Sequence, residues 1–189
     1  RSVLHREELA DLFHIVGHNQ FRTSFAVEEA VSTRANIVVL SILRPCDPPS
    51  LATLEGVRRE LAGKILVDVT VPLVPPRVAR VQLLQAGSAV VEAQRMLGDA
   101  TRVVSAFQNV SHERLEALDQ PVGCDVLVCG DDKEAREQVV RLATAAGMRA
   151  LHAGSLANSA AAEALTSVLI FMNGFYKAHG AGIQLVGLD

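Results

Sequence analysis

The chain alternates short runs of aliphatic residues with amphipathic stretches. The runs are rich in valine, leucine and isoleucine, which is typical of strands buried on both faces of a parallel sheet. They predict strands at residues 36–42, 64–69, 102–106, 125–129 and 149–152, with a weaker one at 21–25. Helical spacing of apolar residues predicts helices at residues 26–33, 51–61, 88–97, 133–146 and 157–176, and Ser50 suits the N-cap of the second. Strands that alternate with helices form βαβ units with right-handed crossovers, so the pattern predicts an α/β fold with a parallel sheet.

The first residues follow a different pattern. Residues 1–13 place Leu9, Leu12 and Phe13 at helical spacing, so we expect the chain to open inside or just before a helix. A free-standing α/β domain usually starts with a strand. We therefore expect part of the fold to be missing upstream of Arg1.

One predicted core strand ends in polar side chains. Its apolar run closes at Ala106, and Gln108, Asn109 and Ser111 follow. In open α/β sheets ligands bind at the carboxyl ends of the strands, and the strands at residues 36–42 and 64–69 should end on the same edge. A ligand site and a plain polar turn that caps the next helix explain residues 101–111 about equally well.

Composition narrows the class of protein. Hydrophobic residues make up 49% of the 189, aromatic residues only 4%, and tryptophan is absent, so the core must be aliphatic. The net charge of −3 comes from scattered charges, which argues against a nucleic-acid partner. No apolar run approaches the ~18 residues of a membrane span, and no signal peptide is visible. We expect a cytoplasmic protein without a membrane partner, whose Cys46, Cys124 and Cys129 are reduced core thiols.

The residues that usually carry chemistry form no recognisable arrangement. No Ser/His/Asp or Cys/His grouping appears, and the histidines are scattered. His14 and His18 are four apart, but Gly17 between them makes two solvated histidines the better interpretation than a metal site. Asp131 and Asp132 fit the start of a helix, where carboxylates stabilise the dipole.

Residues 154–158 precede the last predicted helix and leave two interpretations open. Their amides and side chains could hold an anion or a carbonyl, or Ser155 or Asn158 could simply cap the helix. A site of neutral polar groups without acid, base or metal suits hydride transfer between two bound cofactors, because the cofactors carry the chemistry.

Four segments together resemble a known family. Residues 63–75, 103–110, 124–132 and 153–159 are similar, in order and spacing, to the NADPH-dependent F420 reductases (F420H2:NADP oxidoreductases). The reductase domains of six-transmembrane metalloreductases are similar over the same stretches. The resemblance covers the chain from about residue 1 to 188 and implies a Rossmann-like, mostly parallel, doubly wound sheet with a C-terminal helical extension.

The chain departs from that family at its start. Family members begin with a strand and a glycine-rich turn that holds the NADP pyrophosphate, and this chain lacks both. We therefore expect residues 1–152 to form an incomplete dinucleotide-binding domain, and residues 153–189 to form a helical segment that completes the coenzyme site. A second departure is Gln108, where some relatives have histidine beside the deazaflavin.

The resemblance implies NADP(H) and coenzyme F420 as cofactors, with direct hydride transfer between nicotinamide C4 and deazaflavin C5. It implies neither a catalytic side chain nor a metal. The implied cofactor-binding residues are Arg1 at the 2′-phosphate; Ser41, Ile42, Leu43, Thr70, Val71 and Pro72 beside the ribose and nicotinamide; Ala106, Phe107, Gln108, Asn109 and Val110 where the rings stack; and Gly154, Ser155, Leu156 and Asn158 on the deazaflavin side.

Two other functions remain open at this point. One is another nicotinamide-dependent reductase of the same fold, with a flavin, a metal or a small imine or keto compound as acceptor. The other is a non-catalytic nucleotide-binding module that has lost its phosphate loop.

The helix predicted at residues 157–176 is apolar around much of its circumference. A helix that covers a sheet needs an apolar stripe of only ~100°. The apolar residues of this helix are Leu165, Val168, Leu169, Ile170, Phe171, Met172 and Phe175, and the surplus beyond that stripe predicts a homodimer interface. The alternative is a helix buried wholly within one subunit.

Overall fold

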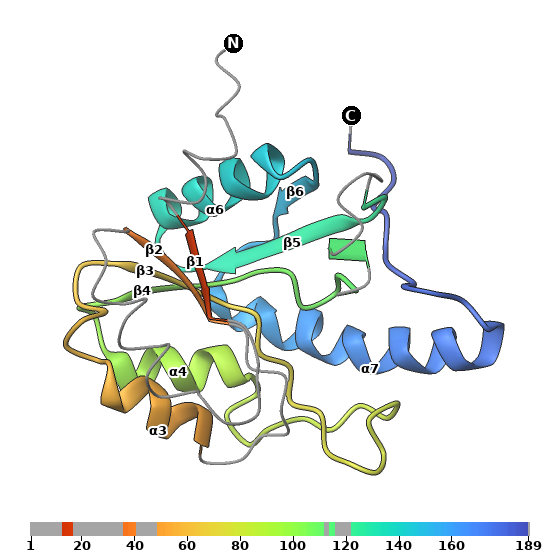
Figure 1. The fold of residues 1–189 in the computed structure, drawn as a ribbon, viewed down its shortest axis with the longest axis horizontal. Helices are drawn as coiled ribbons and strands as arrows, with labels where there is room; N and C mark the ends of the chain where they lie inside the picture. The colour runs from red at the N-terminus through yellow and green to blue at the C-terminus, as the bar shows by residue number, and fades with distance from the viewer. Residues whose placement is uncertain (1–12, 17–35, 41–48, 112–113, 116–121, 189) are drawn as a thin grey trace.

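The computed structural model describes residues 13–16, 36–40, 49–111, 114–115 and 122–188, which form a six-stranded sheet with helices on both faces (Figure 1). The strands, in sheet order, are β1 (Phe13–Val16), β2 (Ile37–Leu40), β3 (Ile65–Asp68), β4 (Arg102–Ser105), β5 (Asp125–Gly130) and β6 (Arg149–His152). The helices are α3 (Pro49–Gly56), α4 (Ala89–Leu97), α6 (Lys133–Ala145), the 3-10 helix η1 (Leu156–Asn158) and α7 (Ser159–Tyr176). The α/β, Rossmann-like fold with a C-terminal helix is confirmed.

The sheet is parallel except at one pair of strands. β1 to β4 run parallel in sequential order, and β6 runs parallel to β5. β5 is antiparallel to β4, with Ser105 opposite Cys129. Neighbouring strands in one direction need a long, usually helical, crossover, and the pattern between β4 and β5 predicts no helix. This reversal is what makes the sheet mostly rather than wholly parallel.

Successive side chains of each strand point to opposite faces of the sheet, so the sheet separates two hydrophobic cores. Val38, Leu66 and Val103 face α3 and α4. On the other face, Ile65 and Val104 pack with residues of α6. Figure 1 shows α6 above the sheet, with α3, α4 and α7 below it. The strands are buried on both faces, which is why their sequences read as continuous aliphatic runs.

Helix starts follow the expected capping chemistry in part. The Ser88 side chain accepts a hydrogen bond from Val91 N at 3.2 Å and caps α4. Asp132 Oδ1 accepts from Ala135 N at 2.7 Å and caps α6, so the capping interpretation of this acidic pair is confirmed for Asp132.

The predicted bounds of three helices need correction. The helix expected at residues 51–61 with Ser50 as its cap instead begins at Pro49 and ends at Gly56. Proline suits a first helical turn because its missing N–H has no partner there. α7 begins at Ser159, after the 3-10 turn. The helix expected over residues 1–13 does not include Phe13, which opens β1, because pairing with β2 outweighs the local periodicity.

Several other expectations fall on residues beyond those described. Residues 1–12 lie outside the described part, as do the weak strand at 21–25 and the helix at 26–33. His14 lies in β1, so helical spacing does not relate it to His18. Within the described ranges, no helix is both long and apolar enough to cross a membrane.

Candidate functional site

β3 and β4 bring two of the predicted turns together at the carboxyl edge, the edge of the sheet where β2, β3 and β4 end. Asp68, the last residue of β3, joins them through its main-chain carbonyl. That oxygen accepts hydrogen bonds from Ala106 N at 3.4 Å and from Gln108 Nε2 at 2.8 Å. The turn at Thr70 and the turn at Gln108 are therefore neighbours, as the parallel strands predicted.

Four predicted residues cannot be placed. Ser41, Ile42, Leu43 and Arg1 lie outside the described residues. β2 ends at Leu40 and runs parallel to β3, so the chain leaves it at the carboxyl edge. The contacts of these four residues stay predictions.

The turn after β4 has a strained backbone. Phe107 has φ of 70°, in the left-handed region that a bulky side chain rarely adopts. Such a residue costs about 1–3 kcal/mol and persists only where its surroundings fix it. Val110 N donates to Phe107 O at 3.0 Å and closes the turn.

Three neighbouring elements hold this turn in place. From β3, Asp68 O accepts the Gln108 side-chain amide at 2.8 Å. At the start of β5, Asp125 O accepts Asn109 Nδ2 at 2.7 Å. From α7, Thr166 Oγ1 donates to Gln108 O at 2.6 Å. Strain fixed from several sides is characteristic of ligand-binding turns.

The same turn holds polar atoms that are buried without a partner. Gln108 Oε1 and Asn109 Oδ1, and Ser105 Oγ at the end of β4 just before the turn, have none among the described residues. Both amide nitrogens are already engaged, so the two carboxamide oxygens remain as acceptors. A buried acceptor without a donor costs about 1–3 kcal/mol. A bound group with N–H or O–H donors would offset that cost, so the turn fits an amide-bearing heterocycle such as the two implied cofactors carry.

Asp68 is a buried carboxyl at this edge of the sheet. Its side chain is buried, and burial raises the pKa of the carboxyl above its usual value, although hydrogen bonds from Thr70 oppose the rise. Thr70 N donates to Asp68 Oδ1 at 2.8 Å, which fixes the turn after β3. Sequence reasoning passed over Asp68. The available signal was a carboxylate that ends an otherwise aliphatic strand.

A second buried carboxylate lies between α7 and α4. Glu163 accepts hydrogen bonds from Ser88 Oγ at 2.6 Å, Ala89 N at 3.0 Å and Val90 N at 3.3 Å. Burial raises the pKa of its carboxyl, these hydrogen bonds oppose the rise, and the charge of Asp68 adds to it. Glu163 also lines a small recess between the first half of α7 and the segment that follows Pro72.

Residues 154–158 follow β6, which runs parallel to β5 and opposite to β4. Ser105 pairs with Cys129 and Val128 pairs with His152, so β6 ends close to the level at which β4 ends. Gly154 O accepts from Gly130 N at 3.1 Å, and Leu156 is buried against α4 with its N–H donated to Asp131 Oδ1 at 2.9 Å. Ser155 and Asn158 are exposed, and neither makes a side-chain cap.

The deazaflavin-side role implied for Gly154, Ser155, Leu156 and Asn158 therefore stays a prediction. In the described structure it is Thr166, two turns into α7, that reaches the Gln108 turn. Sequence reasoning did not find Thr166, because a threonine inside an apolar helix carries no signal of its own.

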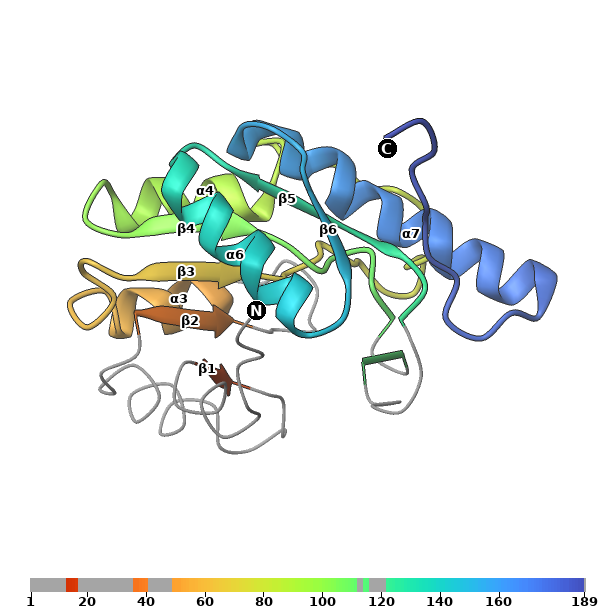
Figure 2. The same cartoon turned by 90° about the horizontal axis from the view of Figure 1, so that it is seen from above.

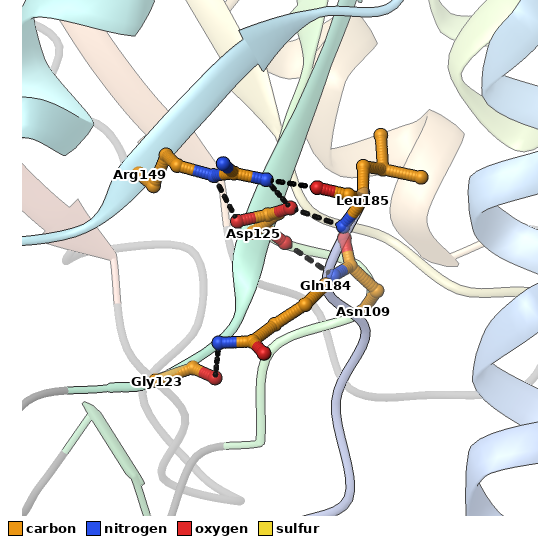
Figure 3. A network of polar contacts seen from close by, with 6 residues as sticks. All are labelled: Asn109, Gly123, Asp125, Arg149, Gln184 and Leu185. Carbon is orange, nitrogen blue, oxygen red and sulfur yellow. Dashed lines mark hydrogen bonds and ion pairs between the residues drawn. The ribbon is translucent and has the colours of Figure 1, made fainter. Parts of the chain in front are cut away.

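The C-terminal segment is tied to the same turn through Asp125 (Figure 3). Arg149 donates to both carboxylate oxygens of Asp125 at 2.7 Å, and Leu185 N donates to Oδ2 at 2.6 Å. The Arg149 hydrogen bonds hold the pKa of Asp125 below its usual value. Its carbonyl holds Asn109, so Asp125 connects the end of the chain to the candidate site (Figure 3).

Comparison with known proteins gives no matching family model but clear relatives. The chain is 42% identical over 144 residues to an F420-dependent NADP reductase of Methanocaldococcus jannaschii, covering 74% of this chain and 64% of the relative. It thus spans just under two thirds of that relative. It is 32% identical over 182 residues to an F420-dependent NADP reductase of Methanothermobacter thermautotrophicus, covering 94% of this chain and 77% of the relative.

Two further likenesses agree with these. The rat metalloreductase STEAP3 is 35% identical over 138 residues, which cover 73% of this chain and 26% of that protein. The fold matches a solved structure of a candidate F420-dependent NADP reductase from Arthrobacter sp. FB24, with a TM-score of 0.70 and 24% identity over 85% of this chain and 72% of the other. The resemblance drawn from four short segments is confirmed over most of the chain, which belongs to the F420-dependent NADP reductase family.

Proposed function

We propose that the protein transfers a hydride between NADP(H) and coenzyme F420. The observation that carries this proposal is the Ala106–Val110 turn at the carboxyl edge, which is strained at Phe107 and whose two uncharged carboxamide oxygens have no partner in the described part of the chain. Family membership supports the identity of the two cofactors.

The chain's own part in this reaction is to bind and orient. When bound, the cofactors supply the carbon that gives the hydride and the carbon that accepts it. The turn at Thr70, Val71 and Pro72 and the Ala106–Val110 turn would hold the rings side by side, and their buried apolar residues would exclude water. Gln108 Oε1 would accept a hydrogen bond from a ring substituent. Alignment of this kind supplies most of the rate in a reaction that needs no acid or base.

The test is NADPH oxidation with F420, FAD and FMN as alternative acceptors. We expect turnover with F420 to exceed turnover with either flavin. Gln108→Leu removes an acceptor, which costs about 0.5–1.5 kcal/mol, so kcat/KM should fall roughly threefold to tenfold. Gln138→Leu, on α6, is the matched control and should change little.

Equal or faster turnover with a flavin would favour a different acceptor. If the protein transfers hydride to none of the three acceptors, the proposal is refuted. We further propose that the protein is cytoplasmic. Cys124 and Cys129, which are buried free thiols, support this location.

We also propose that the protein is a homodimer built on the second half of α7. This half projects past the sheet (Figure 2). It exposes one apolar face at helical spacing, and the rings of Phe171 and Phe175 stack on it with centroids 5.7 Å apart. The residues of this face are Val168, Phe171, Met172, Phe175 and Tyr176. Apolar faces of this kind mark interfaces, and two-fold dimers are the commonest outcome.

Light scattering decides between a dimer and a monomer. We expect a dimer that Phe171→Glu and Phe175→Glu dissociate. Leu83→Glu, at a residue that is 71% exposed but lies outside α7, should leave the dimer intact. A wild type that is monomeric at high micromolar concentration would refute the interface.

A further inference from the structure

Thr166 uses its hydroxyl in a way that is unusual for a threonine inside a helix. Such a hydroxyl commonly donates back to the carbonyl four residues earlier. In α7 that contact, from Thr166 Oγ1 to Ala162 O, is long at 3.5 Å. A much shorter hydrogen bond of 2.6 Å runs to Gln108 O, in the turn after β4. The hydroxyl therefore links α7 to the candidate cofactor site.

This hydrogen bond acts on the strained part of the turn. Gln108 follows Phe107, whose φ of 70° depends on outside contacts. Asp68 O holds the Gln108 side chain at 2.8 Å, and Thr166 holds its main-chain carbonyl. Because the Gln108 side chain and its main-chain carbonyl are both held, the orientation of the Oε1 acceptor is fixed.

We propose that Thr166 is a positioning residue for the hydride transfer, because its hydroxyl sets the Phe107–Gln108 backbone against which the rings lie. The inference rests on the proposed function. Thr166 does not touch the reacting atoms, and its effect passes through the Gln108 carbonyl. Small misplacements of an aligned site reduce rate more than binding, so its loss should appear in kcat.

The test compares two substitutions at this position in the full-length protein, with NADPH and F420 as the substrates. Thr166→Val keeps the β-branched shape and removes the hydroxyl, whereas Thr166→Ser keeps the hydroxyl. We expect Thr166→Val to lower kcat roughly threefold to tenfold, with KM for NADPH within about twofold of wild type. Thr166→Ser should recover kcat to within about twofold.

Thr144→Val is the matched control. Thr144 lies on α6, and its hydroxyl makes the ordinary back-bond to Val140 O at 2.8 Å. This variant should leave kcat unchanged. A second readout is the kinetic isotope effect with NADPH deuterated at the transferred hydrogen. This isotope effect should be larger in Thr166→Val than in wild type, because a slower hydride transfer limits turnover more strongly in the variant.

Each outcome decides the question. An unchanged kcat in Thr166→Val overturns the inference, and so does a Thr166→Ser variant as slow as the valine variant. A loss of thermal stability in Thr166→Val without a change in kcat or isotope effect also overturns it. If the wild type exchanges no hydride, the proposed function fails and the inference with it. If the wild type is active and the variants match it, the inference alone fails.

Discussion

Glu163→Ala tests how one buried carboxylate connects α7 to α4. The wild-type carboxylate accepts from Ala89 N and Val90 N, two of the N–H groups that have no partner within α4. Alanine leaves both without an acceptor, at about 1–3 kcal/mol each. Ser88 Oγ still lies 2.6 Å from Ser159 Oγ, so its partner is not lost. The expected loss in the free energy of unfolding is about 4 kcal/mol, or about 8–16 °C in Tm for a domain of this size.

Glu163→Gln separates the hydrogen bonds from the charge. Ala89 N donates to Oε2 and Val90 N to Oε1, so the amide keeps an acceptor for only one of the two N–H groups, and we expect a loss of about 1–3 kcal/mol at acidic pH. The wild-type carboxyl has a folded pKa above its usual value. Its contribution is therefore fully present below the unfolded pKa and is lost as pH rises through the folded pKa. The stability of wild type relative to Glu163→Gln should fall as pH rises, because the amide does not titrate.

Urea denaturation followed by circular dichroism, at several pH values, measures both effects. Glu137→Ala, at an exposed carboxylate on α6, is the control and should stay within about 0.5 kcal/mol of wild type. If the free energy of unfolding of Glu163→Ala lies within about 1 kcal/mol of the wild-type value, the two N–H groups have found other partners and the reasoning is refuted. A wild-type advantage over Glu163→Gln that grows with pH would refute the direction of the pKa shift.

Two further predictions concern contacts outside this pair of helices. Asp125→Asn should destabilise the protein most at neutral pH, because Arg149 lowers the pKa of the Asp125 carboxyl. Its contribution is present above the unfolded pKa and is lost as pH falls through the folded pKa. Thermal melts of wild type and variant should converge in acid, and a constant gap would contradict this. Gly154→Ala should cost about 1–2 kcal/mol, because φ is 95° and the added Cβ would lie 2.7 Å from Asn158 Nδ2; an unchanged urea midpoint would contradict it.

Local pattern was enough to find most described elements. The strand expected at residues 149–152 has those bounds, and the one expected at residues 64–69 differs by one residue at each end. These strands can be predicted from the sequence because burial on both faces favours a continuous run of aliphatic residues. The helix expected at residues 88–97 begins one residue later, at Ala89, because Ser88 is its N-cap.

The sequence predicted the candidate site only in the part that is formed by turns following adjacent parallel strands. The turn at Thr70 and the turn at Gln108 follow adjacent parallel strands, so their meeting at one edge follows from the topology. Residues 154–158 were grouped with them by resemblance alone, and they follow β6, which runs opposite to β4 because β5 is antiparallel to it. No periodicity in the sequence specifies the direction of a strand, because a run of aliphatic residues reads the same either way.

The sequence by itself determined the α/β class, the aliphatic cores, the order of the elements and the family. Only the tertiary structure decided which polar groups meet: Glu163 with the start of α4, Thr166 with the Gln108 carbonyl, and Asp68 with both turns. The physical reason is the range of each interaction. Burial and capping act on a residue and its near neighbours, so they leave a repeating local signature. A hydrogen bond between residues 40 or more positions apart forms only after two surfaces have packed, and neither partner alone records it.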